Sequence, residues 1–152
     1  MTEQRVKRLS ALAVALWLGM QIGFYAASLV LFNQLDKTEA GRIAGILFHI
    51  ANWTGLAAWS TAWLTCRHTL PLRHEKGRFT RRWIALLLTL LAFAEWVVNP
   101  VIHALKHGQS HWLPNLLGGG FGAWHGTSYI LYLIISLMGL GLGIRLLRLE
   151  VR

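Results

Sequence analysis

The sequence predicts an all-α membrane protein, a four-transmembrane-helix bundle with both termini in the cytoplasm. Apolar residues make up 55% of the 152-residue chain, charged residues make up 14%, and the mean hydropathy is +0.45. Soluble domains carry about 25% charged residues. Four apolar runs are long enough to cross a hydrocarbon core, which takes about 20 helical residues. We place these spans at about residues 9–32, 42–66, 83–105 and 118–147, within a single domain of residues 1–152.

The first run follows Arg5, Lys7 and Arg8, as the apolar part of a cleaved signal peptide also follows basic residues. The apolar part of a signal peptide has about 7–15 residues, and this run is longer. We therefore expect it to be retained as a span. The later runs are joined by short polar segments, of which the longest contains Pro71.

Basic residues indicate the orientation of the spans. All but three of the 15 Lys and Arg residues lie near the two termini or between the second and third spans. The exceptions are Lys37, Arg42 and Lys106. The positive-inside rule places both termini and the middle loop in the cytoplasm. The same charge suits anionic lipid headgroups, so we expect the lipid bilayer, and no nucleic acid, as a partner.

Small residues recur at intervals of four in the first, second and last spans. Such patterns let membrane helices approach closely. The glycines at which we predict helix contacts are Gly19, Gly23, Gly41, Gly45, Gly122 and Gly126, with Gly139 and Gly143 further along the last span.

A polar stripe in the third span predicts the functional region. Glu95, Asn99 and His103 recur every four residues and therefore share one face of a helix. His107 continues the pattern, but we expect it beyond the membrane. A carboxylic acid near the bilayer centre costs on the order of 2.5–3.5 kcal/mol, so it normally faces the interior of a bundle and has a function.

Helix depth brings further polar residues to this stripe. At a rise of 1.5 Å per residue, His49 lies roughly 10 Å below Arg42. The last span starts outside and places His125 about two turns in. The candidate binding residues, in the outer half of the bundle, are His49, Asn52, Glu95, Asn99, His103, His125 and Ser128. Pro100 removes one backbone donor, and the bend either opens space beside Glu95 or is accommodated by neighbouring helices.

Several short motifs carry a resemblance to a known family. They are Ala40-Gly41-x-x-Ala44-Gly45, Asn99-Pro100-x-Ile102 and above all Phe121-Gly122-x-Trp124-His125-Gly126-x-Ser128. On these motifs the chain resembles a domain-of-unknown-function family of small bacterial membrane proteins, which is similar to the eukaryotic transmembrane protein 205. The resemblance extends over nearly the whole chain and implies a four-helix fold in the bacterial inner membrane with a polar centre around His125 and Ser128. It implies no reaction or substrate.

Three functions are open on the sequence. The first is a non-enzymatic protein that binds or moves a small solute or metal, with the imidazoles of His49, His103 and His125 as candidate metal ligands. The second is a redox protein that binds haem or a quinone, with His49 and His125 as axial ligands. The third is a structural or accessory subunit that binds another membrane protein or a second copy of the chain. We expect no hydrolase, because Ser128 follows His125 by three residues but no third catalytic member is visible.

Overall fold

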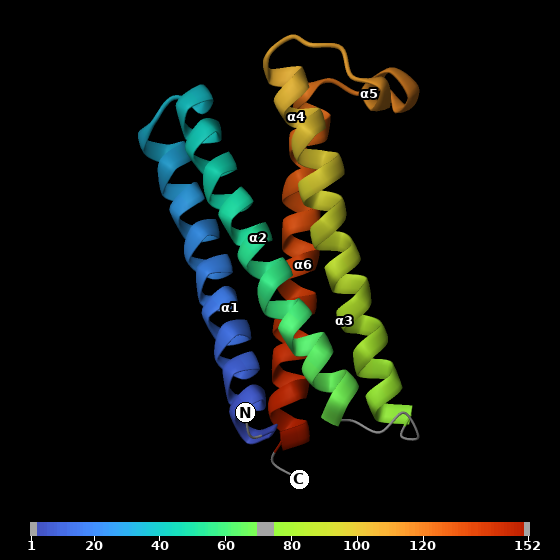
Figure 1. The fold of residues 1–152 in the computed structure, drawn as a ribbon. Helices are drawn as coiled ribbons and strands as arrows, with labels where there is room; N and C mark the ends of the chain where they lie inside the picture. The colour runs from blue at the N-terminus through green and yellow to red at the C-terminus, as the bar shows by residue number, and fades with distance from the viewer. Residues whose placement is uncertain (1–2, 70–74, 151–152) are drawn as a thin grey trace.

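A computed structural model describes residues 3–69 and 75–150, and every regular element in these residues is helical. The elements are α1 (Glu3–Gln34), α2 (Lys37–Thr69), α3 (Glu75–Phe93), the π-helix η1 (Ala94–Val98), α4 (Asn99–Lys106), α5 (Trp112–Leu117) and α6 (Phe121–Glu150). Because α3, η1 and α4 follow one another without a break, they form one long rod (Figure 1). The prediction of an all-helical chain is confirmed.

The long helices alternate in direction around a closed ring of contacts. Helix α2 packs against α1 and α3, and α6 packs against α1, α3 and α4. Helices α1 and α3 begin, and α2 and α6 end, at the same end of the bundle (Figure 1). Toward the other end, which carries α5, the α1–α2 pair separates from the α4–α6 pair. The residues near the end that carries α5 therefore lie where the two helix pairs diverge.

Three of the helices have the length and apolar composition of membrane spans. They cover Arg8–Gln34, Arg78–Lys106 and Phe121–Leu146. These agree with the first, third and fourth predicted spans, except that the last helix starts three residues later than 118. The positive φ angles of Gly118 and Gly119, 76° and 91°, interrupt the helix there. The expected second span, 42–66, lies inside the 33-residue helix α2, which is not among the three.

Local sequence explains where two of the helices begin. Oδ1 of Asp36 accepts hydrogen bonds from the backbone N–H groups of Thr38 at 2.9 Å and Glu39 at 3.1 Å. An aspartate in this position satisfies donors that have no partner inside the first turn of a helix. At the start of α5, Nδ1 of His111 accepts from the backbone N–H of Leu113 at 3.3 Å.

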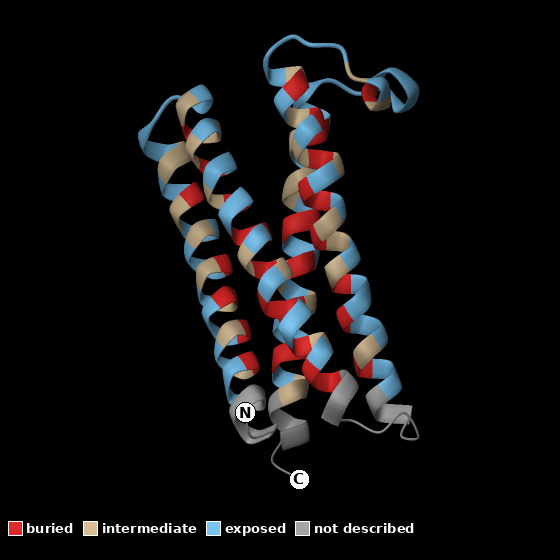
Figure 2. Cartoon of the chain, viewed as in Figure 1, coloured by how far each residue is buried: buried red, intermediate tan, exposed pale blue. Residues whose placement is uncertain are grey.

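Trp17 holds the lower half of the bundle together. Its indole is 1% exposed, and its Nε1 donates to the carbonyl oxygen of Ala51 at 2.8 Å. The indole lies against Gly55 of α2 and Gly139 of α6, where an added Cβ would come within 2.5 Å of the ring. Figure 2 shows that the buried positions lie mainly on the faces that the helices turn toward one another. The indole ring from α1 thus occupies the space left by two glycines, one on α2 and one on α6.

The glycine contacts differ from those predicted. An added Cβ would meet nothing within 4 Å at any of the six predicted contact glycines, which are Gly19, Gly23, Gly41, Gly45, Gly122 and Gly126. Within this chain none of them is a close helix contact. Gly139 and Gly143 do face α1, and Gly55 admits Trp17. Four-residue spacing thus identifies the contact at Gly139 and Gly143 but not the other six, because it describes a face of a helix without saying which face meets a neighbour.

Candidate functional site

Glu95 lies inside the π-helix that links α3 to α4. Its side chain is buried, and the residue is 6% exposed. The backbone N–H of Asn99 donates to the carbonyl of Ala94, five residues earlier, instead of the residue four earlier. Pro100, which has no N–H to donate, comes directly after this turn. The expected bend at Pro100 therefore takes the form of one widened turn around Glu95, an arrangement often found at functional sites.

Four side chains surround the Glu95 carboxyl group. Oε2 accepts hydrogen bonds from Nδ2 of Asn52 at 3.1 Å and from Nδ2 of Asn99 at 2.8 Å. Oε1 accepts from Nε1 of Trp53 at 3.1 Å. Nδ1 of His49 also contacts Oε1, which makes an ion pair when the imidazole is protonated. We call these five residues the Glu95 cluster, and its donors satisfy a carboxyl group that would otherwise be costly to bury.

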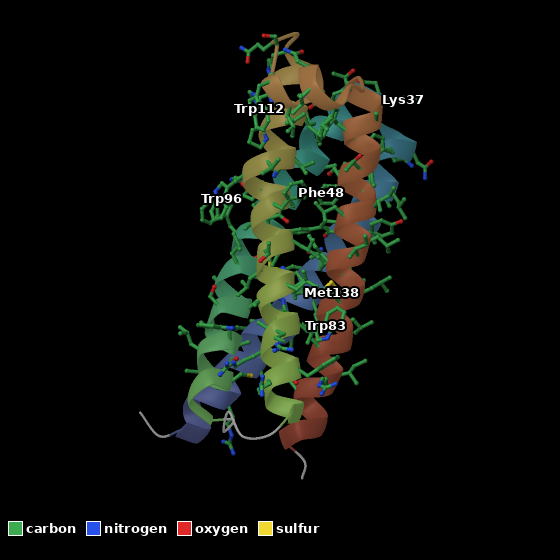
Figure 3. The ribbon with its side chains drawn as sticks, turned by 90° about the vertical axis from the view of Figure 1, so that its right-hand side faces the viewer. Lys37, Phe48, Trp83, Trp96, Trp112 and Met138 are labelled. Atoms are coloured by element: carbon green, nitrogen blue, oxygen red, sulfur yellow. The ribbon has the colours of Figure 1, made fainter. Side chains whose placement is uncertain are left out.

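Through His49, the Glu95 cluster reaches the side surface of the bundle, where the helices face away from the core. The His49 side chain is 57% exposed, whereas that of Glu95 is 5% exposed. Trp53 packs edge-on against His49, with ring centroids 6.3 Å apart, and against Trp96 at 6.1 Å. The label in Figure 3 shows Trp96 pointing outward from the α3–α4 rod. The imidazole and two indoles therefore separate Glu95 from the surroundings of the bundle.

A pocket of about 460 Å³ opens between the two helix pairs at the end that carries α5. Its polar lining residues are Lys37, Thr38, Asn99, Lys106, His125 and Ser128. Its other lining residues are Phe32, Gly41, Gly45, Phe48, Ile102, Leu105 and Phe121. In Figure 3, Lys37 lies toward the α5 end and Phe48 lies deeper between the helices. A volume near 460 Å³ is within the usual range for small-molecule sites.

His125 forms part of an aromatic wall of this pocket. Its ring stacks on Phe121 with centroids 5.4 Å apart, meets Tyr129 edge-on at 5.0 Å and lies 6.4 Å from Phe32. In the first turns of α2, Glu39 pairs with Arg42 at 2.6 Å, and the hydrogen bond from Arg42 lowers the pKa of the Glu39 carboxyl group.

Asn99 belongs to both the pocket and the Glu95 cluster. It lines the pocket, and its amide donates to Glu95. An amide has two N–H donors and an oxygen with two lone pairs, so the bond to Glu95 uses only part of its capacity. Asn99 therefore connects the contents of the pocket to the buried carboxyl group.

The structure divides the predicted site residues into groups. His49, Asn52, Glu95 and Asn99 meet in the Glu95 cluster. Asn99, His125 and Ser128 line the pocket. His103 belongs to neither group, because its exposed ring contacts that of His107, with centroids 4.4 Å apart.

Sequence reasoning missed three functional candidates. Trp53, which donates to Glu95, follows Asn52 directly and shares part of its helix face. Lys37 and Lys106 line the pocket, although their positions suggest only a role in topology. The sequence did contain a clue to the two lysines, because they are among the few basic residues predicted on their side of the membrane.

The three histidines considered as metal ligands have different neighbours. Among residues 3–69 and 75–150, no group of three or more His, Cys, Asp or Glu side chains has an arrangement that would hold a metal ion. His49 contacts Glu95, His103 contacts His107, and His125 packs against aromatic rings. The pair considered for haem, His49 and His125, thus has one member beside a carboxyl group and one in an apolar wall.

Comparison with known proteins identifies a family. No curated protein and no solved structure matches the chain. A family model described as "Domain of unknown function (DUF4149)" matches residues 12–111. This segment contains every residue of the Glu95 cluster but ends before His125 and Ser128, so the resemblance found on the motif of the last helix lies outside it. Because the match covers more than half of the 152 residues, this chain, with its apolar helices of membrane-spanning length, belongs to the DUF4149 family.

Proposed function

We propose that this protein crosses the bacterial inner membrane four times, with both termini in the cytoplasm, and binds a small solute in the outer pocket. The ends of the long helices support the topology, because the start of α1, the end of α2, the start of α3 and the end of α6, which carry most of the basic residues, lie at one end of the bundle. Helix α2 serves as the fourth span. A bacterial origin and a likeness to the eukaryotic transmembrane protein 205 are parts of the same proposal.

Helix α2 is not among the three helices with the apolar composition of a membrane span, and its polar residues explain how it can still be the fourth span. Asn52 and Trp53 direct their donors at Glu95, and His49 contacts the same carboxyl group. The buried Asn52 and Glu95 satisfy each other inside the bundle, as polar residues in membrane helices usually do, while the exposed His49 and Trp53 each turn a ring nitrogen toward the carboxyl group. The polar character of α2 thus reflects the Glu95 cluster.

The position of Asn99 is the observation that carries solute binding. A solute that hydrogen bonds to Asn99 in the pocket changes the donor that Asn99 offers to Glu95. Binding in the pocket is thereby linked to the hydrogen bonds around Glu95, which join α2 to the α3–α4 rod. Such a link lets a bound solute act on the contact between these helices.

A thermal-shift experiment tests the binding function. The purified protein, in phosphatidylcholine nanodiscs, is heated with decanoate, decylamine or decan-1-ol, and the melting temperature is followed by tryptophan fluorescence. Gly45→Leu fills the pocket, because Gly45 lines it and an added Cβ there has open space. Gly23→Leu is the matched control, since Gly23 is exposed on α1, has open space and does not line the pocket.

We expect at least one of these probes to raise the melting temperature of the wild type and of Gly23→Leu, because a ligand that binds only the folded state stabilises it. The same probe should leave Gly45→Leu unchanged. An equal response of Gly45→Leu and the wild type, or no response to any probe, would contradict a solute site in the pocket.

An accessory function is the second candidate, and the completeness of the Glu95 cluster favours it. Both carboxyl oxygens already have partners from α2 and from the α3–α4 rod, so the cluster ties these helices together without any ligand. Under this alternative, Asn99→Ala lowers the melting temperature but leaves the response to every probe as it is in the wild type. A change in probe affinity in Asn99→Ala supports solute binding instead.

A further inference from the structure

We propose that the solute is an elongated organic anion with an apolar body and a hydrogen-bonding group at the end opposite the charge. This inference rests on the solute-binding function and names the chemical class that the same pocket accepts. It follows from the order in which charged, apolar and polar side chains succeed one another from the mouth of the pocket to its floor.

The mouth of the pocket is cationic. Lys37, at the start of α2, and Lys106, at the end of α4, both line it and are exposed. In the part of the chain that the structure describes, no acidic side chain lines the pocket and neither lysine forms a salt bridge. The carboxylates nearby are engaged, because Asp36 caps α2 and Glu39 pairs with Arg42. The two ammonium groups are therefore available to an anion.

Apart from the lysines, most of the pocket wall is apolar. Phe32 of α1, Phe121 of α6 and the aliphatic Ile102 and Leu105 of α4 line it, and the ring of His125 stacks on Phe121 in the same wall. Gly41 and Gly45 expose the backbone of α2 and leave room beside it. Apolar walls of this kind favour a ligand body without charge, since burying an unpaired charge there is costly.

The floor of the pocket is polar again. From Lys37 to Phe48, the lining residues of α2 extend over about 16 Å at 1.5 Å per residue. At the depth of Phe48, the innermost lining residues of α4 and α6 are Asn99 and Ser128. An amide and a hydroxyl group both donate and accept hydrogen bonds. A ligand that reaches them from the mouth is elongated and benefits from a polar group at its far end.

Binding measurements with matched probes test this class. Isothermal titration in phosphatidylcholine nanodiscs compares decanoate, decylamine and 10-hydroxydecanoate. We expect 10-hydroxydecanoate to bind about 2- to 10-fold more tightly than decanoate, the gain of one buried hydrogen bond. We expect decylamine to bind more weakly than decanoate, because its charge is repelled by the two lysines.

Variants at each end of the pocket separate the two contributions. Lys37→Gln with Lys106→Gln should weaken both acids about 3- to 10-fold. The control, Arg8→Gln with Arg78→Gln, removes two positive charges at the opposite end and should leave both affinities unchanged. Ser128→Ala should abolish the preference for 10-hydroxydecanoate over decanoate, while binding of decanoate itself is retained.

Several results would overturn this proposal. Equal binding of decylamine and decanoate, or full affinity in the double lysine variant, shows that the mouth does not select a negative charge. Native mass spectra of the wild type and of Gly45→Leu test a lipid ligand. If the wild type retains phosphatidylglycerol and Gly45→Leu loses it, the pocket holds a membrane lipid instead of a free solute. If decylamine binds tightly and Gly45→Leu abolishes this binding, the pocket binds a solute but does not select an anion. If no probe binds, both fail.

Discussion

The side-chain amide of Asn99 donates to Oε2 of Glu95 at 2.8 Å, and the same side chain lines the pocket at the end of the bundle that carries α5. One residue thus joins a buried carboxyl group to a cavity of about 460 Å³. The remaining partners of Glu95 come from α2, so any change at Asn99 acts on a contact between two helices as well as on the pocket.

We predict that Asn99→Ala lowers the free energy of unfolding by about 1–3 kcal/mol, because a buried carboxyl oxygen loses one of its two donors. Titration with sodium dodecyl sulfate, followed by circular dichroism, measures this change. Asn33→Ala is the matched control, since Asn33 is exposed near the end of α1 and its replacement should have little effect. Equal losses in the two variants would show that the bond to Glu95 contributes nothing specific.

Glu95→Gln should also destabilise the protein by about 1–3 kcal/mol, although the side chains have nearly the same shape. A glutamine has one oxygen and one NH₂ group, so its NH₂ group faces either the amides of Asn52 and Asn99 or the ring nitrogens of Trp53 and His49. Donors then face donors, and at least one bond is lost.

Glu39→Gln provides the control for the charge change, because the Glu39 side chain is 43% exposed and pairs with its neighbour Arg42 on the helix surface. Its melting temperature should equal that of the wild type. Wild-type stability in Glu95→Gln would mean that the cluster tolerates a neutral amide and that its hydrogen bonds do not hold the helices together.

Gly55→Ala and Gly139→Ala should each lower stability by about 1–3 kcal/mol, because the new methyl group would overlap the buried ring of Trp17. Gly19→Ala and Gly23→Ala should instead be neutral or stabilising by about 0.4–1 kcal/mol, since their Cβ positions are open and alanine favours helix. Melting temperatures of the four variants in one detergent provide the comparison. The prediction is wrong if Gly19→Ala and Gly23→Ala melt at lower temperatures than Gly55→Ala and Gly139→Ala.

The topology predicts which side of the membrane each loop faces. In a Cys66→Ala background, Gln109→Cys should react with a membrane-impermeant maleimide added to intact cells, and Arg78→Cys should react only after the membrane is permeabilised. Gln109 lies in the segment between α4 and α5, and Arg78 lies near the start of α3. Reaction of both positions in intact cells would exclude an orientation with both termini inside.

Composition and apolar run length were sufficient to predict an all-helical chain with membrane-spanning helices, because these properties depend on residues close together in sequence. Four-residue spacing also placed Glu95 and Asn99 on one face, and their side chains do meet. The same spacing failed at His103. His103 follows Asn99 by one further turn on α4, but its ring is exposed and lies against that of His107 instead of in the pocket.

The sequence by itself determined the class of the protein, the positions of its long apolar helices and the presence of a carboxyl group inside one of them. Only the tertiary structure decided which side chains reach that carboxyl group. Trp53 and Asn52 approach Glu95, Trp17 selects Gly55 and Gly139 as its neighbours, and the two lysines share a pocket. The rotation of each helix about its own axis is set by packing against the others, and no local pattern in one helix contains that information.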